Sequence, residues 1–198
     1  MQPTRNQSTR PNAIDPDRPA FVYRPAISRS DTGSRGECSY GKSAGAPTEA
    51  GCYAAGDAAY AWLTDTAKVP ANRVILMGEL LGSGVAVDLA TRHDHRALVL
   101  MCPFTSLPAA AKTRFPVLPT HTLMQNRFES LSKIGRCRRP LFVAHGTADG
   151  TVPVWQGEAL FAAANEPKEF LRLEGHTHND VGGAHFYRPL AAFLDRHP

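Results

Sequence analysis

The sequence predicts an α/β fold, a three-layer sandwich in which a mainly parallel sheet lies between helices. Short continuous apolar segments recur along the 198-residue chain, and stretches with apolar residues at helical spacing lie between them. Continuous apolar segments are typical of strands that are covered on both faces. Parallel neighbours need a crossover connection, usually a helix, so this alternation favours a parallel sheet with helices packed on it.

Each element follows from these patterns in chain order. A first helix is expected to open at Thr48-Glu49 and to end at Pro70. Its apolar face collects Cys52, Ala55, Ala59 and Leu63. Buried strands are predicted at Arg73–Gly78, Ala97–Cys102, Leu141–His145 and Glu169–Leu173. Further helices are predicted at Gly82–Arg92, at Val154–Ala164 and from about Pro189, because proline suits a first helical turn.

Two regions of different composition are expected. Residues 1–36 are rich in Pro, Arg, Ser, Thr, Asn and Asp, with one short apolar group at Phe21–Tyr23. Such a stretch buries too little apolar surface to offset its ordering entropy, so we expect it to be mostly disordered. Residues 37–198 are expected to form one domain, ordered from about Tyr40. Within it, the proline-punctuated stretch 104–140 predicts short helices that form a minimal cap.

Charge and cysteine usage narrow the class of protein. The net charge is +4 and the pI about 9.0, and clusters of basic residues lie in residues 1–36 and 133–139, but no basic stripe interleaved with aromatics and no nucleic-acid motif accompanies the charge. We therefore expect no nucleic-acid partner. Four cysteines without a C-x-x-C pair suit a reducing compartment. The first thirty residues hold no apolar run of the kind that a signal peptide or a membrane span needs, so we expect a cytoplasmic protein.

Three predicted strand ends carry candidate functional residues. Open parallel sheets place their sites at the carboxyl ends of strands. The first strand is followed by Gly78–Gly82 (GELLG), the third by His145–Asp149 (HGTAD) with Val152-Pro153, and the fourth by Gly175–Asp180 (GHTHND). These segments are expected to meet at one edge of the sheet.

In this order the three segments resemble the nucleophile elbow, acid loop and base loop of the α/β-hydrolase superfamily. The turn around Tyr40-Gly41-Lys42-Ser43 and the cap segments Phe104–Leu107 and Phe128–Ile134 also resemble one branch of it. That branch contains bacterial serine-aminopeptidase-like hydrolases and eukaryotic depalmitoylase-type α/β-hydrolase-domain proteins. The resemblance covers residues from about 40 to 198 and implies serine-hydrolase chemistry on ester, thioester or amide bonds.

The resemblance also implies residue roles. Asp149 would be the acid, His178 the base, and the backbone N–H of Leu81 an oxyanion donor, while Leu80 stands at the nucleophile position. An aliphatic side chain has no lone pair with which to attack a carbonyl. No His-Gly-rich strand end precedes Tyr40 to supply a second oxyanion donor, and losing one such donor costs roughly 100–1,000-fold in rate. We expect an inactive homologue without a cofactor, whose ligand would be a small acyl-type molecule.

The sequence leaves two other interpretations open. A working hydrolase could pair Asp149 and His178 with water or with a surrogate nucleophile, but Ser83 is expected to be a packing residue and Ser43 a turn residue. His176-x-His178-x-Asp180 superficially matches the H-x-H-x-D motif of metallo-β-lactamase-like enzymes. That motif continues with histidine where Val181 stands and comes early in its chain, so no metal site is expected.

The sheet edge beside Arg73–Gly78 is a further expectation. The resemblance implies that the N-terminal part of the fold is deleted or replaced, which would leave this apolar strand at an edge. Exposed edges recruit other chains. Homo-oligomerisation, capping by Phe21–Tyr23 and poor solubility are the outcomes that the sequence leaves open.

Overall fold

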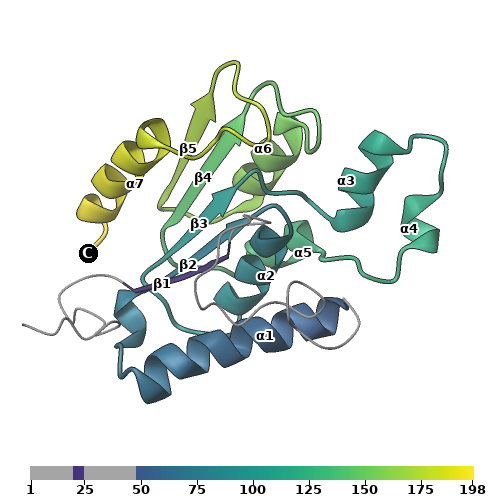
Figure 1. The fold of residues 1–198 in the computed structure, drawn as a ribbon. Coiled ribbons are helices and arrows are strands. Elements are labelled where there is room, and N and C mark those ends of the chain that lie inside the picture. Colours follow the sequence, from purple (N-terminus) through teal and green to yellow (C-terminus); the bar gives the residue numbers. More distant parts are fainter. Residues whose placement is uncertain (1–19, 25–47) are drawn as a thin grey trace, which may run out of the picture.

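The computed structural model describes residues 20–24 and 48–198, so Cys38, Tyr40 and Ser43 fall outside the described part. Its sheet consists, in spatial order, of β1 (Ala20–Arg24), β2 (Val74–Glu79), β3 (Ala97–Met101), β4 (Leu141–Gly146) and β5 (Lys168–Leu173) (Figure 1). Each strand is parallel to its neighbours. The predicted α/β fold with a parallel sheet is confirmed.

The central strands are buried on both faces, which explains their continuous apolar sequences. Along β2, Val74 and Leu76 belong to one hydrophobic cluster, whereas Ile75 and Met77 belong to another on the opposite face. Successive side chains of a strand point to opposite faces, so one apolar strand serves two cores. A polar residue in such a strand would face a core on either side.

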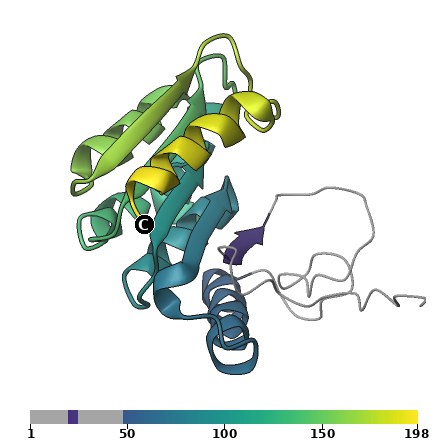
Figure 2. The same cartoon turned by 90° about the vertical axis from the view of Figure 1, so that its left-hand side faces the viewer.

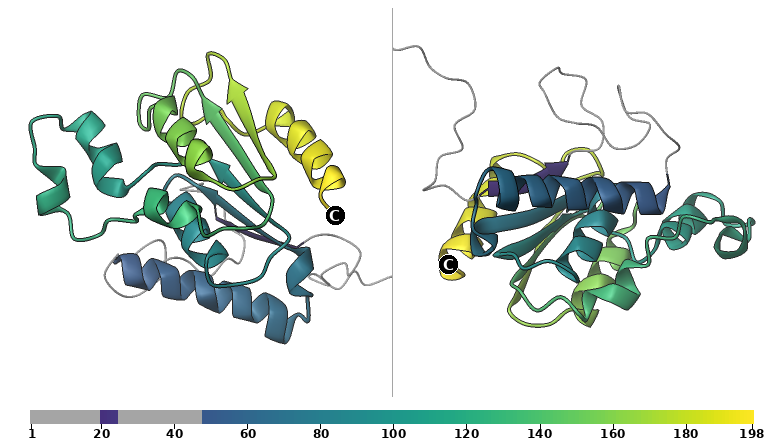
Figure 3. Two further views of the ribbon diagram at one scale, coloured as in Figure 1. Left: turned by 180° about the vertical axis from the view of Figure 1, so that it is seen from behind. Right: turned by 90° about the horizontal axis from the view of Figure 1, so that it is seen from below.

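Helices cover both faces of the sheet. One face packs against α1 (Glu49–Ala61), α2 (Leu81–Ala90), α5 (Ser130–Ile134) and α6 (Val154–Ala163). The other packs against α7 (Ala184–Arg196), which lies in front of the strands in Figure 2 and on the far side from α1, α2 and α6 in Figure 3. The remaining helices, α3 (Leu107–Arg114) and α4 (Thr120–Leu123), form the cap between β3 and α5. The predicted three-layer sandwich is confirmed.

The first helix opens as predicted but ends earlier. Thr48 accepts a hydrogen bond from the Gly51 N–H at 3.0 Å, which caps α1 at Glu49. The helical path continues through a π-helical turn at Trp62–Thr66, and a short 3-10 helix follows at Ala71–Arg73. The predicted end at Pro70 is wrong, because Lys68 already takes a left-handed conformation, with φ 57°, and closes the helix.

The predicted start of the last helix at Pro189 is also wrong. α7 begins at Ala184, directly after Gly183 with φ 120°, and Pro189 lies inside it. Packing explains the longer helix. The fully buried Phe186 shares the inward face with Leu190 and Phe193 at helical spacing, so core contacts begin before the proline.

Strand β1 was not predicted. Ala20–Arg24 pairs in parallel with Val74–Gly78 and so covers the edge of β2. Of the three outcomes left open for that edge, the structure has capping by the segment that contains Phe21–Tyr23. Homo-oligomerisation through a sheet edge stays a prediction, and β1 rather than β2 is the outer strand at this side. The expected disorder of residues 1–36 does not hold for Ala20–Arg24, and the rest of that stretch lies outside the described residues.

The buried side chain of His95 is expected to make the free energy of unfolding decrease at acidic pH. Its side chain is 1% exposed; Nδ1 lies 2.9 Å from the His93 carbonyl oxygen, and Nε2 has no partner among the described residues. Burial lowers the pKa of His95, so the stability that it contributes is present above its unfolded pKa of about 6.5 and declines as the pH falls toward its folded pKa. Between about pH 7.5 and 5.5, His95→Asn, which does not titrate, should lose less stability in urea unfolding than the parent. Equal losses would contradict this.

Candidate active site

The turn after β2 has the geometry of a nucleophile elbow. Leu80 takes φ 47° and ψ −116°, a backbone conformation rare for a residue with a side chain, and its N–H donates to the Met101 carbonyl at 3.1 Å. A Cβ atom at Gly78 would lie 2.2 Å from the Gly82 carbonyl oxygen. The turn therefore requires glycine at position 78, and it holds position 80 in a strained conformation of the kind found at functional sites.

Leu81 and Ser83 follow in the first turn of α2. Leu81 is the first residue of that helix, where a backbone N–H has no intrahelical acceptor, as an oxyanion donor requires. The Ser83 side chain is fully buried, and its hydroxyl donates to the Leu80 carbonyl at 2.5 Å. The structure thus agrees with the interpretation of Ser83 as a packing residue.

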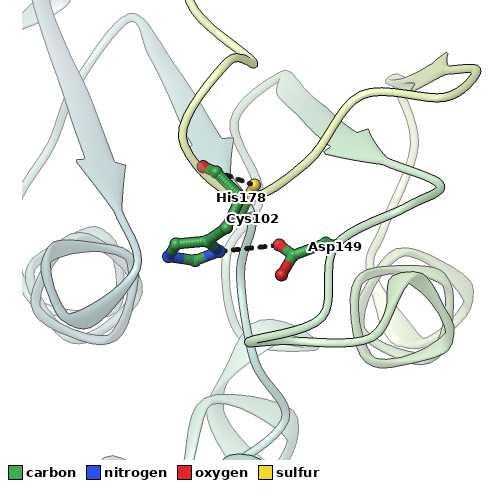
Figure 4. Close-up of side chains that lie close together, drawn as sticks. All are labelled: Cys102, Asp149 and His178. Carbon is green, nitrogen blue, oxygen red and sulfur yellow. Dashed lines mark hydrogen bonds and ion pairs between the residues drawn. The ribbon is translucent and has the colours of Figure 1, made fainter.

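The structure brings Asp149 and His178 together from the loops after β4 and β5. The ring nitrogen Nδ1 of His178 lies 2.7 Å from Oδ2 of Asp149 (Figure 4). The loops themselves are joined, since the Ala148 N–H donates to the His176 carbonyl at 2.9 Å. With Asp149 ionised, Nδ1 donates the proton of this hydrogen bond, which leaves Nε2 of the neutral ring as a hydrogen-bond acceptor.

Asp149 is held ionised by its surroundings. Burial alone would raise its pKa, but hydrogen bonds from the histidines His145 and His178 and from the Val152 N–H hold the pKa of Asp149 well below its ordinary value. Its Oδ1 accepts from the N–H groups of Thr151 and Val152, each at 2.8 Å. Both carboxylate oxygens are therefore occupied, which fixes the orientation of the carboxylate toward His178.

His145 is a residue of this site to which the sequence interpretation gave no role, although it opens the His145–Asp149 segment. Its side chain is fully buried at the end of β4, and Nε2 lies 2.8 Å from the Val152 carbonyl and 3.4 Å from Asp149 Oδ2. A Cβ atom at Gly157 would lie 2.4 Å from Nδ1 of this ring, so α6 packs directly against it. The position of His145 at a buried strand end was the available signal.

Cys102 was also missed, although it follows β3 at the same edge. Its Sγ, a carboxylate oxygen of Asp149 and a ring nitrogen of His178 all lie within 4.8 Å of one another (Figure 4). These three atoms are the metal-ligand candidates within the described residues. However, the oxygen and nitrogen are already joined by a hydrogen bond. Burial, and then the charge of Asp149, raises the pKa of the Cys102 thiol above its ordinary range, whereas a metal or a nucleophilic role requires the thiolate.

The other residues of the H-x-H-x-D match do not join His178 in a metal site. The His176 ring packs 4.5 Å from the His185 ring, and its Nδ1 lies 3.1 Å from the Glu174 carbonyl oxygen. Asp180 accepts a hydrogen bond from the Thr177 N–H at 2.6 Å. Within the described residues, the candidate site therefore consists of the hydrogen-bonded pair Asp149–His178 and the strained turn at Leu80 after β2.

Comparisons with known proteins identify relatives of this chain and structures of the same fold. No family model matches the chain. An uncharacterized protein of Mycobacterium tuberculosis is 39% identical over 141 residues, 71% of this chain and 50% of that protein. Human α/β hydrolase domain-containing protein 17B is 35% identical over 142 residues, 72% of this chain and 48% of that protein. The crystal structure of the α/β hydrolase GrgF from Penicillium sp. sh18 covers 79% of this chain and 76% of its own, with a TM-score of 0.61 at 18% identity.

This chain belongs to the α/β-hydrolase superfamily. It spans about half the length of the curated relatives it matches. The turn at Leu80 and the loops of Asp149 and His178 follow one another in the chain order that the superfamily's elbow, acid and base have, and the roles of these three residues stay predictions. None of the helices in the described part of this α/β-hydrolase is both long and apolar enough to span a membrane.

The Asp149 carboxylate is expected to stabilise this α/β-hydrolase. Asp149→Ala removes the acceptor for two backbone N–H groups and should lower the free energy of unfolding by about 2–4 kcal/mol, measured by urea denaturation. Asp149→Asn, which keeps an acceptor oxygen, should cost less. Because the pKa of Asp149 is lowered on folding, its contribution is present above about pH 4 and is lost as the pH falls through the folded pKa. Equal losses in both variants would contradict the hydrogen-bond account.

Proposed function

We propose that this chain is a non-catalytic α/β-hydrolase that retains the acid–base pair of the superfamily. One observation carries the proposal: an aliphatic side chain, that of Leu80, occupies the strained tip of the elbow. Covalent catalysis needs a nucleophile at this position, which His178 would deprotonate and the Leu81 N–H would support. Leucine can neither attack a carbonyl nor receive a proton, so the acid–base pair has no nucleophile at position 80 to act on.

Among the described residues, the nearby side chains of Ser83 and Cys102 do not supply a substitute. The Ser83 hydroxyl is buried and bonded to the Leu80 carbonyl. The Cys102 side chain is fully buried, and the raised pKa of its thiol keeps it protonated.

The alternative function, an active hydrolase of ester, thioester or amide bonds, is favoured by the 2.7 Å contact between His178 and Asp149, which could activate water. If the chain had lost only the nucleophile, the contact between His178 and Asp149 would still be present. The contact is therefore compatible with an inactive protein.

The test is intact-mass analysis of the folded chain after exposure to a fluorophosphonate probe, with circular dichroism as the check on folding. We expect no added mass on the parent chain or on His178→Ala. One added probe mass on the parent, absent from His178→Ala, would identify a surrogate nucleophile and overturn the proposal. Hydrolysis that depends on His178 without any added mass would instead identify direct action on water.

We further propose a small acyl-type molecule as the ligand and the cytoplasm as the location. The apolar Leu80 at the elbow would contact an acyl chain, while the Leu81 N–H would meet a carbonyl or carboxylate oxygen. In a thermal-shift titration with octanoate, the parent should gain stability. Leu80→Asn, which tolerates positive φ, should not, and an equal shift in both would contradict the assignment. Cys102 and Cys137 form no disulfide within the described residues, which fits a reducing compartment.

A further inference from the structure

The cap carries a concentration of exposed apolar side chains. We define the cap arm as residues 107–127, which comprise α3, α4 and the segments around them. Four of the eight large exposed hydrophobic residues in the described part lie on it: Phe115 (52% exposed), Val117 (91%), Leu118 (44%) and Leu123 (64%). Apolar side chains gathered on so short a segment mark an interaction site rather than ordinary surface.

The cap arm is held in shape from within and at its base. The Leu107 N–H donates to the Arg127 carbonyl at 2.7 Å, which closes the base of the arm. The buried Thr120 hydroxyl donates to the Pro108 carbonyl at 2.9 Å and ties α4 to α3. Phe128, only 2% exposed, anchors the returning chain in the core. Figures 1 and 3 show α3 and α4 projecting from the rest of the molecule, so the exposed apolar residues lie on a protruding, folded element.

The charged side chains of the cap arm are all positive. It contains Lys112, Arg114 and Arg127 and no aspartate or glutamate. Within the described residues, Arg127 pairs with Glu129 at 2.9 Å, whereas Lys112 donates to the Leu118 carbonyl at 3.0 Å and forms no ion pair. Arg114 is exposed and likewise has no ion pair with a described residue. Lys112 and Arg114 therefore flank the apolar tip without a compensating carboxylate among the described residues, whereas Arg127 has one in Glu129.

We propose that the cap arm docks on an anionic lipid bilayer. Apolar side chains at a protruding tip can enter the boundary between headgroups and acyl chains, while adjacent lysine and arginine attract anionic headgroups. A protruding tip fits the surface of a bilayer better than it fits a ligand that needs an enclosing pocket. Docking does not depend on whether the candidate active site is catalytic, so the proposed function can fail while this proposal stands.

The test is co-sedimentation of the full chain with phosphatidylcholine vesicles, with and without phosphatidylserine. We expect binding to the anionic vesicles that weakens with added salt. Val117→Ser combined with Leu123→Ser should weaken it at least about tenfold. Lys112→Glu combined with Arg114→Glu should weaken it more than about 20-fold, because each cation near an anionic surface contributes about fivefold. Trp62→Ser, which removes an exposed apolar side chain outside the cap arm, is the matched control and should bind like the parent.

Several outcomes would overturn the proposal. These are no binding to anionic vesicles, equal binding to neutral ones, and binding that survives both double variants. A dimer that forms without vesicles and is lost in the Val117→Ser, Leu123→Ser variant would assign the cap arm to a second copy of the chain instead. Circular dichroism checks the fold of each variant. The Lys112→Glu, Arg114→Glu variant alters only exposed side chains. Its vesicle binding therefore tests the proposal even if the Val117→Ser, Leu123→Ser variant does not fold.

Discussion

Leu80→Ser is expected to react covalently with a fluorophosphonate and to hydrolyse p-nitrophenyl acetate at least about 100-fold faster than the parent. The elbow conformation is already present at Leu80, and Asp149 already holds His178 at 2.7 Å. A serine there would supply the missing nucleophile at the carboxyl edge of the sheet, where the base loop also lies. If the proposed Leu81 N–H is the single oxyanion donor, the rate should stay roughly 100–1,000-fold below that of a complete site.

Two controls make this result specific. Leu80→Ala removes the leucine side chain without adding a nucleophile and should remain unreactive. Leu80→Ser combined with His178→Ala should lose the reactivity, because serine at its ordinary pKa is a poor nucleophile without a base. If folded Leu80→Ser gained neither probe mass nor hydrolysis, the retained acid–base pair would not be competent, and more than the nucleophile would separate this chain from an active hydrolase.

Gly78→Ala is expected to lower the free energy of unfolding by about 3 kcal/mol or more. A Cβ atom at this position would lie 2.2 Å from the Gly82 carbonyl oxygen, 2.4 Å from its carbon and 2.7 Å from the Ser83 nitrogen. All three atoms belong to the backbone, so no side-chain rotation can relieve the overlap. The elbow would have to open, which would displace both Leu80 and the start of α2. Urea denaturation measures the loss.

Gly150→Ala is the matched control for this substitution. A Cβ atom at Gly150 would have no neighbour within 4 Å, and its backbone needs no positive φ. The change in stability should therefore be below about 0.5 kcal/mol. A loss at Gly78 no larger than that at Gly150 would show that the elbow tolerates a side chain and that its tight geometry is not required.

Much of the fold could be predicted because the apolar pattern is strong in the centre of the sheet. The predicted strand Arg73–Gly78 differs by one residue from β2, Val74–Glu79, because burial on both faces makes every side chain apolar. β1 could not be predicted in this way. Its register, with Ala20 opposite Val74, joins residues far apart in the chain, and a short apolar group among polar residues has no local signal of its partner.

The site was predictable where a motif fixed the spacing. Asp149 and His178 were singled out from loop sequences, and the structure brings them into contact, whereas their catalytic roles remain predictions. Cys102 and His145 were missed, because a buried cysteine or histidine at a strand end looks like a core residue until neighbouring strands are aligned. The strain at Leu80 could not be predicted from leucine itself, since the left-handed turn is imposed by the backbone packing of Gly78 against Gly82.

The strand order has a consequence for the synthesis of this protein. Because the strands follow one another across the sheet in chain order, their crossover helices pack on one face, and the sheet is singly wound. Within the described residues, α7 is the helix that covers the other face, where Ile75, Val99 and Phe142 lie. Domains begin to fold as they leave the ribosome. A nascent chain would therefore present a nearly complete sheet with one apolar face open until α7 has been made, and this interval is when chaperone binding should matter most.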